Sequence, residues 1–268
     1  MVEEKEKPAT TEEKVDNVEK QIVKSVKDKR GFDKESWKPV TGIGKKVMSG
    51  EITDVDEILN TGQKMLESGI VDALLPDLNT ELLLIGQSKG KFGGGQRRIF
   101  KQTQKKTKEG NKPHFAIFAA TGDENGHVGL GYGKSKETVP SREKAIRRSK
   151  LNLIKIRRGC GSWQCGCKEP HSIPFAIKGK CGSAIIELMP APKGTGLKVE
   201  GECAKILKLA GVKDVWSKTQ GQTGTKTNLV VACFESLKNL VKVKVGSNHY
   251  ESLGVVDGKI AEKVEKDE

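Results

Sequence analysis

The segment from Gly126 to Gly159 constrains the fold more than any other part of the chain. Its sequence is GHVGLGYGKSKETVPSREKAIRRSKLNLIKIRRG, in which a glycine-spaced strand is followed by a basic helix that Thr138 and Pro140 begin. Glycine inside a strand is typical of a place where another backbone or a ligand approaches closely. We therefore expect Gly129, Gly131 and Gly133 to face either another backbone or RNA, although a glycine-rich strand end without a ligand has the same pattern.

The charge of this segment favours a polyanionic partner. Ten basic residues are accompanied by only two acids, Glu137 and Glu143. The basic residues are Lys134, Lys136, Arg142, Lys144, Arg147, Arg148, Lys150, Lys155, Arg157 and Arg158. A solvated helix face usually mixes both signs, whereas a phosphate backbone rewards many cations at once. Nucleic acid is the favoured interpretation, and a solvated helix face is the alternative.

Charge is distributed unevenly along the 268 residues, whose formal net charge is +13. Residues 1–80 carry 13 basic and 17 acidic side chains, and residues 81–268 carry the net positive remainder. A strongly basic portion is expected to bind nucleic acid or another anionic surface. The first twenty residues are charged throughout, and no apolar run approaches the length of a bilayer span. The expectation is a soluble, cytoplasmic protein without a membrane partner.

The pattern of elements predicts an α+β fold in five parts. Residues 1–36 are expected to form a charged, disordered arm, and 37–79 a helical N-terminal extension with two short helices. A small domain of three strands and a helix is predicted over 80–152, with a strand at 81–87 and a basic loop or hairpin at 91–112. A second α/β domain is predicted over 153–242. Residues 243–268 are expected to be a charged tail.

Two enzyme motifs fail on spacing. A phosphate loop needs a glycine five positions before the Gly-Lys-Ser at 133–135, but Val128 occupies that position. A dinucleotide fingerprint needs its third glycine three positions after the second, and here it follows after two. No acid-base or nucleophile set is recognisable: Cys160 and His171 are a conceivable catalytic pair, but the sequence names no third orienting group or substrate pocket for them. We expect no catalytic activity.

Four residues within one short loop have the chemistry of a metal site. Cys160, Cys165, Cys167 and His171 have the spacing C-x4-C-x-C-x3-H, and three thiolates with one imidazole suit tetrahedral zinc. The loop has little else to order it, so a metal would supply folding energy. The C-x-C spacing is tighter than the usual C-x2-C. Alternatively, Trp163 anchors the loop by packing, or RNA holds a free-thiol loop. The remaining cysteines are expected to be small core residues.

Two glycine loops precede predicted helices, at 193–196 and 221–225. Exposed amides at a helix N-terminus attract phosphate oxygens, which makes Lys193 and Gly194 candidates for RNA contact. The alternative for each loop is a simple turn with a capping Thr.

An ordered series of motifs resembles one family. The strings GHVGLGYGKSKE, AIRRSKLNLI, RRGCGSWQCGC, PHSIPF, GKCGS and PAPKGTG occur in that order. They are similar to the small-subunit ribosomal proteins of the S-five family, in the archaeal form that is related to the eukaryotic S-two protein. The resemblance covers about residues 37–242. It implies a double-stranded-RNA-binding-like domain and, after it, an α/β domain of the S-five C-terminal type.

The resemblance also implies a location within the ribosome and a set of binding partners. Members of the family lie near the decoding centre and the mRNA entry channel, bind ribosomal RNA, contact the S-four and S-eight proteins, and influence accuracy. We therefore expect a structural constituent of the small subunit, archaeal in type and not a homo-oligomer. The family's glycine-arginine loop corresponds here to 93–98, and this chain departs from bacterial members in the longer, more basic segment that follows.

The expected RNA-binding residues combine the charge pattern with this resemblance. They are Lys91, Arg97, Arg98, Lys101, Lys105, Lys106, Lys134, Arg142, Arg147, Arg148, Arg157, Arg158, Lys193 and Gly194. A free RNA chaperone or regulatory RNA-binding protein is the main alternative function, and a metal-dependent enzyme using the Cys-His loop is a more distant one.

Overall fold

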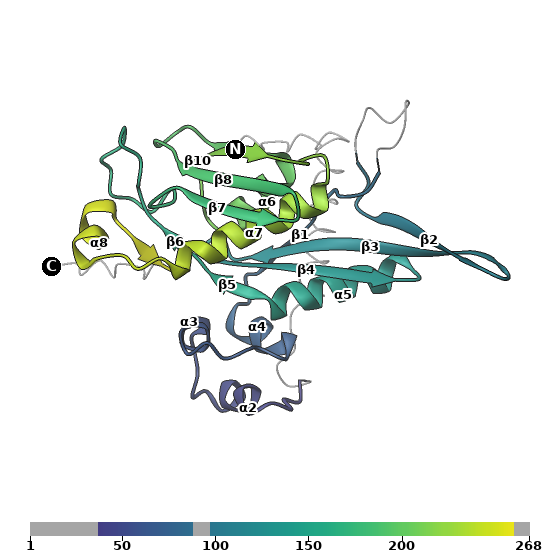
Figure 1. The fold of residues 1–268 in the computed structure, drawn as a ribbon. Helices are drawn as coiled ribbons and strands as arrows, with labels where there is room; N and C mark the ends of the chain where they lie inside the picture. Colours follow the sequence, from purple (N-terminus) through teal and green to yellow (C-terminus); the bar gives the residue numbers. More distant parts are fainter. Residues whose placement is uncertain (1–36, 88–96, 260–268) are drawn as a thin grey trace, which may run out of the picture. The chain divides into compact units, whose positions relative to one another are not determined.

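The first sheet is antiparallel and is built around one long central strand. The computed structural model describes residues 37–87 and 97–259 (Figure 1). The strand order is β1-β3-β4-β5, and β2 pairs with the free length of β3. The bounds are β1 Asn79–Leu82, β2 Lys101–Thr107, β3 Gly110–Gly122, β4 His127–Ser135 and β5 Leu153–Lys155. The predicted α+β class is confirmed.

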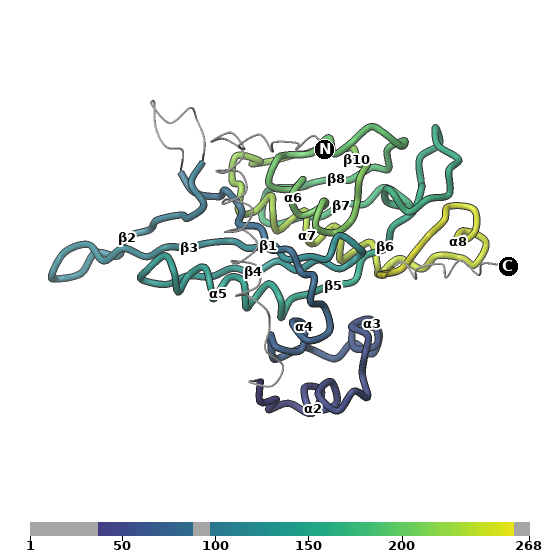
Figure 2. Tube along the Cα trace, turned by 180° about the vertical axis from the view of Figure 1, so that it is seen from behind, coloured from purple at the N-terminus to yellow at the C-terminus, as the bar shows by residue number. Residues whose placement is uncertain are grey.

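The β2–β3 hairpin continues beyond the rest of this sheet. Strand β4 pairs with β3 only between Phe115 and Gly122, whereas β2 pairs with β3 from Gly110 to Ala116. The end of the hairpin is therefore a two-stranded ribbon, which Figure 2 shows extending past β4. This ribbon is the basic hairpin extension that the sequence predicted as one of two possibilities.

Strand β4 and helix α5, Thr138–Leu151, lie in close contact because neither presents a large side chain to the other. At three glycines of β4, an added Cβ would collide with a carbonyl oxygen of α5. These are Gly129, Gly131 and Gly133, facing Ser149, Ala145 and Ser141 respectively. The three α5 residues are buried and recur every four positions, so they form one face of the helix. The backbone approach expected from the glycine spacing is confirmed.

A second sheet and two helices form the other half of the core. Its strand order is β7-β8-β10-β9, with β10 antiparallel to β8 and parallel to β9. The bounds are β7 Ile177–Cys181, β8 Ala184–Pro190, β9 Leu197–Lys198 and β10 Val215–Gln220, with helices α6 Gly201–Leu209 and α7 Lys226–Lys242. Helix α7 lies against β7, where a Cβ on Gly179 would collide with the carbonyl oxygen of Ala232.

One hydrophobic core joins the two predicted domains. Buried side chains of the first sheet, including Phe118 and Leu130, belong to the same cluster as Ile206 of α6 and Phe234 of α7. The described residues from Pro39 to Lys259 accordingly belong to one compact unit. The boundaries at 80–152 and 153–242 remain predictions, but the two segments do not fold around separate cores.

The strand predicted over 81–87 is shorter than expected. Strand β1 ends at Leu82, because the amide of Leu84 donates to Oε2 of Glu202 on α6, at 2.8 Å, and leaves the sheet ladder. The apolar run LLLI is explained by burial of Leu83 and Ile85 in the shared core.

Three short helices, where the sequence predicted two, precede the first sheet. They are α2 Gly42–Ser49, α3 Val55–Asn60 and α4 Ser68–Leu74. Helix α2 was missed because two of its first three residues are glycine, yet Thr41 caps it by accepting from the Gly44 amide, and Gly50 ends it in the left-handed region. Helix α4 lies beside α5 (Figures 1 and 2). Nζ of Lys150 on α5 pairs with Oδ1 of Asp72 on α4 at 2.5 Å.

The expectation that 243–268 is simply a charged tail is wrong for its described part. Helix α8, Ser247–Leu253, and strand β11, Val256–Asp257, follow α7, and β11 pairs with β6, Arg157–Arg158. Gly254 ends α8 in the left-handed region and turns the chain back. The sequence did not predict α8 and β11, because the segment is locally polar and its hydrogen-bonding partners lie about a hundred residues earlier in the chain.

Helix α3 is attached to β4 by a buried histidine. Both ring nitrogens of His127 meet carboxylates, Nδ1 with Asp123 at 2.6 Å and Nε2 with Asp56 of α3 at 2.8 Å. Burial alone would lower the pKa of His127, but the hydrogen bonds and charges of Asp123 and Asp56 outweigh it and raise the pKa above 6.5. The imidazolium therefore holds two elements together.

Replacing Gly131 with Ala should lower the free energy of unfolding by about 1 to 3 kcal/mol or more, because the added methyl forces α5 away from β4. Denaturant unfolding followed by circular dichroism measures the change. The matched control is Gly42→Ala, where nothing lies within 4 Å of the added atom and the change should stay under about 1 kcal/mol. Equal stability of the two variants would contradict the close packing.

Replacing His127 with Asn should cost more stability at pH 6 than at pH 9. A raised pKa contributes stability that is fully present below the unfolded-state pKa and is lost as pH rises through the folded-state pKa. The cavity left by the ring costs the same at both values and cancels. Unfolding of wild type and variant at the two pH values gives the comparison, and a pH-independent difference would show that the histidine is not charged.

Candidate nucleic-acid interface and Cys-His cluster

Helix α5 presents its basic side chains away from β4. Since Ser141, Ala145 and Ser149 take the buried face, Arg142 and Arg147 are exposed on the remainder of the helix. Arg148 is exposed as well, and its guanidinium donates to the carbonyl oxygen of Tyr132 at 2.9 Å, which fixes its direction. The helix therefore carries a row of cations that its own packing leaves open to a partner.

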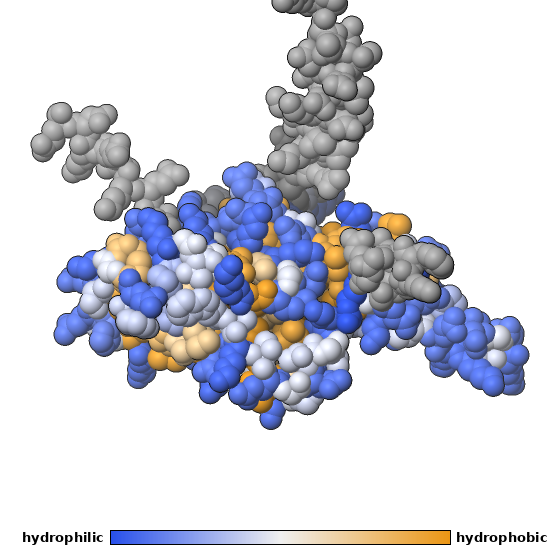
Figure 3. Space-filling model, turned by 90° about the horizontal axis from the view of Figure 1, so that it is seen from above, coloured by the Kyte–Doolittle hydropathy of each residue, from blue (hydrophilic) through white to orange (hydrophobic). Residues whose placement is uncertain are grey.

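The hairpin forms a second basic surface. Lys101, Lys105 and Lys106 of β2 are exposed, and Lys112 of β3 pairs with Glu109 at 2.7 Å. Figure 3 shows a hydrophilic surface over the projecting end of this hairpin, at the right of the view. An isolated two-stranded ribbon is only marginally stable in water, so a lysine-rich ribbon is suited to an anionic partner that surrounds it.

The other predicted cations on the first sheet differ in exposure. Lys134 of β4 and Arg98 are exposed, whereas Arg97 is half-buried. Lys91 lies outside the described residues. The α5 arginines, the hairpin lysines, Lys134 and Arg98 are together called the basic surface below.

The prediction that Arg157 and Arg158 neutralise phosphates is not supported by their placement. Both are buried, at 7% and 3% exposure. Arg157 donates to both carboxylate oxygens of Asp257, at 2.6 and 3.2 Å, and to the carbonyl oxygen of Val243. The hydrogen bonds to Asp257 raise the pKa of Arg157 further. The pair holds the C-terminal segment, which the sequence treated as a free tail.

Arg158 is also used inside the protein. Its guanidinium donates to Oδ1 of Asn125 at 2.9 Å and to the carbonyl oxygen of Gly258 at 3.0 Å. Burial lowers its pKa, against the opposing charge of Asp123. Charge density along the sequence could not separate these two arginines from the exposed ones, because only β11 pairing buries them.

The turn at 191–196 leaves its two candidate RNA-binding residues exposed to solvent. Lys193 and Gly194 are exposed, and Nζ of Lys193 pairs with Oε2 of Glu169 at 2.7 Å. Gly194 and Gly196 both take positive φ, at 89° and 73°, so the turn needs glycine at these positions. The 193–196 loop precedes β9 before α6 begins, so its amides are not directly at the helix N-terminus.

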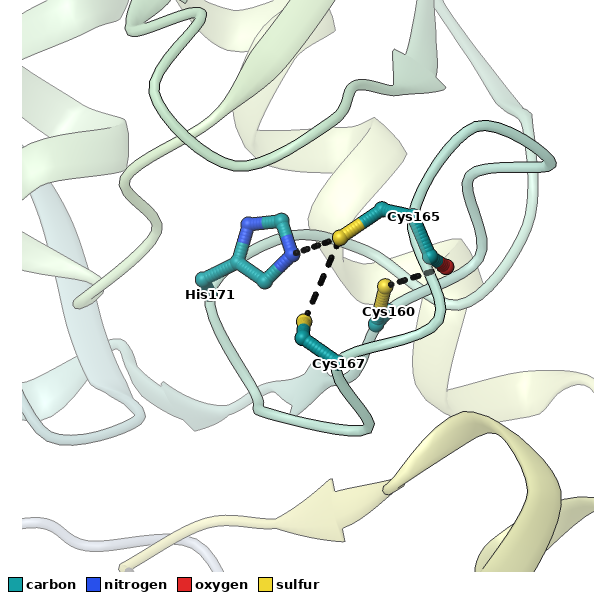
Figure 4. Close-up of side chains that lie close together, drawn as sticks. All are labelled: Cys160, Cys165, Cys167 and His171. Atoms are coloured by element: carbon teal, nitrogen blue, oxygen red, sulfur yellow. Dashed lines mark hydrogen bonds between the residues drawn. The ribbon is translucent and has the colours of Figure 1, made fainter.

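The four predicted metal ligands come together in one cluster (Figure 4). Their ligand atoms all lie within 4.8 Å of one another. Sγ of Cys165 is 3.3 Å from Sγ of Cys167 and 3.8 Å from Nε2 of His171. The side chains converge although the loop between Cys160 and His171 contains neither helix nor strand.

The thiols of the cluster differ electrostatically. Hydrogen bonds from the backbone amides of Lys193 and Cys167 lower the pKa of Cys165 to about 6. Burial, followed by the neighbouring Cys167 and Cys165, raises the pKa of Cys160 to about 11. A bound cation would favour the thiolate form of both.

Trp163 does not anchor this loop. Its side chain is 88% exposed, so the packing alternative is wrong. What the loop does contact is polar: the Cys160 amide donates to the Leu253 carbonyl oxygen at 2.8 Å, and Nδ1 of His171 lies 2.8 Å from Oδ2 of Asp214. Asp214 was missed because it is 43 residues from His171 and no local motif marks it.

An open basic surface on an α+β scaffold defines the class of this protein as a nucleic-acid-binding structural protein. Family models sharpen the class. The description "Ribosomal protein S5, N-terminal domain" matches residues 99–157, and "Ribosomal protein S5, C-terminal domain" matches residues 179–247.

Curated relatives named small ribosomal subunit protein uS5 extend this match over most of the chain. The protein of Nanoarchaeum equitans is 46% identical over 229 residues, which cover 85% of this chain and 98% of the relative. The protein of Methanocaldococcus jannaschii is 46% identical over 230 residues, which cover 85% and 99%. This chain belongs to the uS5 family of ribosomal proteins, and its membership supports a structural role in the small subunit. Among the described residues, no helix is long and apolar enough to cross a bilayer.

Replacing Arg147 with Ala should weaken binding to small-subunit ribosomal RNA and reduce the slope of log affinity against log salt by about one, because one phosphate contact is lost. Replacing Arg157 with Ala should leave that slope unchanged and instead make residues 243–258 sensitive to protease. Fluorescence anisotropy over a salt series and limited proteolysis provide the two readings. A slope that falls for Arg157→Ala but not for Arg147→Ala would contradict the assignment of Arg147 to RNA binding and of Arg157 to contacts within the protein.

Proposed function

We propose that this chain binds ribosomal RNA through its basic surface and serves as an architectural component of the small subunit in the cytoplasm. The observation that carries the proposal is the orientation of α5, whose small face is buried on β4 and whose arginines face outward. Cations carried by a packed helix can neutralise phosphates without the cost of ordering the backbone on binding. Membership of the family supports ribosomal RNA as the partner, and the orientation of α5 supports the basic surface as the part of the protein that binds it.

The contacts proposed are mainly to the RNA backbone. Phosphate contacts fix the position and orientation of a protein, whereas sequence is read at base edges. Double-stranded RNA displays its shape and 2′-hydroxyl groups in a shallow groove. The residues proposed are Arg97, Arg98, Lys101, Lys105, Lys106, Lys134, Arg142, Arg147, Arg148, Lys193 and Gly194. Recognition would therefore be architectural.

The more detailed location of the protein within the small subunit is inferred from its resemblance to the S-five family. We include in the proposal a double-stranded-RNA-binding-like region over 80–152, an N-terminal extension over 37–79, and a relationship to the eukaryotic S-two protein. The proposed neighbours are mRNA at the entry channel, the decoding centre, and the S-four and S-eight proteins. The shared core supports an effect on accuracy, because a stiff body that touches several partners biases the population of subunit conformations.

The proposal assigns no reaction to the Cys-His cluster and instead gives it a structural zinc ion. Three thiolates and one imidazole fill the four positions of a closed tetrahedral site, and no position is left for a substrate or an activated water. Zinc–ligand lengths of about 2.0 to 2.3 Å place tetrahedral ligand atoms about 3.5 to 3.8 Å apart. Sγ of Cys165 lies 3.3 Å from Sγ of Cys167 and 3.8 Å from Nε2 of His171, and all four ligand atoms lie within 4.8 Å of one another, so small side-chain movements would complete the site.

Sedimentation of native small subunits after a high-salt wash tests the ribosomal role. We expect one copy of this chain per subunit, retained in the small-subunit peak, because many phosphate contacts buried within folded RNA dissociate slowly. Matched gradients of subunits carrying Lys105→Ala and Lys106→Ala should show reduced retention.

A free RNA chaperone would give the opposite result. Its exposed phosphate contacts lose affinity steeply with salt, so the chain would move to the top of the gradient. Recovery there, or far less than one copy per subunit at low salt, would reject the architectural proposal.

A further inference from the structure

We infer that Asp214 is the outer-sphere partner of the zinc site and that the bound ion fixes the turn at 191–196 against the Cys-His loop. The inference rests on the zinc ion proposed above and goes beyond it, because it gives the ion a task outside its own loop. That task is to hold Lys193 and Gly194, which belong to the proposed RNA contacts, in one position.

The first link runs through the ligand histidine. Metal-bound histidines usually donate their second ring N–H to a carboxylate, which sets the tautomer and the direction of the ring. Nε2 of His171 faces the sulfur of Cys165, and Nδ1 lies 2.8 Å from Oδ2 of Asp214. The ring is therefore already placed with one nitrogen for the metal and the other for the carboxylate. Both residues are buried, at 5% and 4% exposure, so water does not replace either contact.

The second link runs from the same carboxylate to the turn. Oδ1 of Asp214, the oxygen that His171 does not use, accepts the amide of Gly196 at 2.8 Å. One buried carboxylate thus joins a metal ligand to the end of the turn. The backbone reinforces it, because the carbonyl oxygen of His171 accepts the amides of Lys213 and Asp214 at 2.8 and 3.1 Å.

A third link reaches the middle of the turn through a side chain. Nζ of Lys193 pairs at 2.7 Å with Oε2 of Glu169, which lies within the loop between the ligands. The turn is consequently joined at Lys193 to the Cys-His loop and at Gly196 to the partner of a ligand.

The ion is needed because the loop has few other means of ordering these contacts. Trp163 is exposed, and the residues between Cys160 and His171 form no helix or strand. Three cysteine sulfurs within 4.8 Å of one another cannot all ionise without a cation, because the thiolates would repel one another. Removing the ion should therefore release the loop and, through Asp214 and Glu169, the turn.

Metal affinity of the full chain tests the role of Asp214. Zinc is titrated in competition with a chromophoric chelator, and cobalt substitution gives the absorption spectrum of the site. Wild type should bind one ion with tetrahedral thiolate bands. Asp214→Asn should bind about 10 to 100-fold more weakly, as expected when an outer-sphere carboxylate is lost. Cys181→Ser, a cysteine outside the cluster, should bind like wild type. Equal affinity of Asp214→Asn and wild type would overturn the inference.

Amide hydrogen exchange tests the turn without any variant. In the wild-type chain, the amide of Gly196, which donates to Asp214, should exchange more slowly with zinc than after chelation, while amides of α5 should not change. Identical exchange of the Gly196 amide in both states would overturn the inference even where zinc binds. A wild-type chain that binds no zinc would overturn both the ion and the inference, and would leave the ribosomal role to the sedimentation test.

Discussion

The packing of α5 directly on the backbone of β4 is the contact on which the rest of the structure depends. Three glycines leave the middle of one face of the strand without side chains, and small residues at every fourth helix position match them. The helix has little apolar surface of its own, so this fit, with burial of Ala145, replaces a conventional hydrophobic stripe. As a consequence, the three arginines of α5 are exposed, and the packing on β4 and the proposed RNA binding do not compete for the same face.

The positive charges of the chain divide into two groups with different tasks. The hairpin lysines and the α5 arginines are exposed, and among these described residues only Lys112 forms an ion pair, with Glu109. Arg157 and Arg158 are buried and hold the C-terminal segment through Asp257, Asn125 and Gly258. Burying a charge without a partner is costly, so the two groups cannot exchange roles. His127 and Asp56 use the same principle to attach α3.

The sequence predicted those features whose signal is local. Glycine spacing predicted the close approach at β4, and the spacing of Cys160, Cys165, Cys167 and His171 predicted a cluster that the structure brings together. Features that depend on distant partners were not predictable: β1 ends early because Glu202 takes the Leu84 amide, and β11 forms because β6 is available. Asp214 has no local motif, because its role arises only when His171 is placed beside it.

Ultraviolet crosslinking of native archaeal small subunits, followed by mass spectrometry of the peptides joined to RNA, tests the central claim most directly. The account predicts crosslinks in the peptides that contain the β2–β3 hairpin and the outward face of α5. It predicts none at Arg157 or Arg158, whose guanidinium groups are occupied within the protein. Crosslinks at these two arginines together with none from the hairpin or α5 would contradict it.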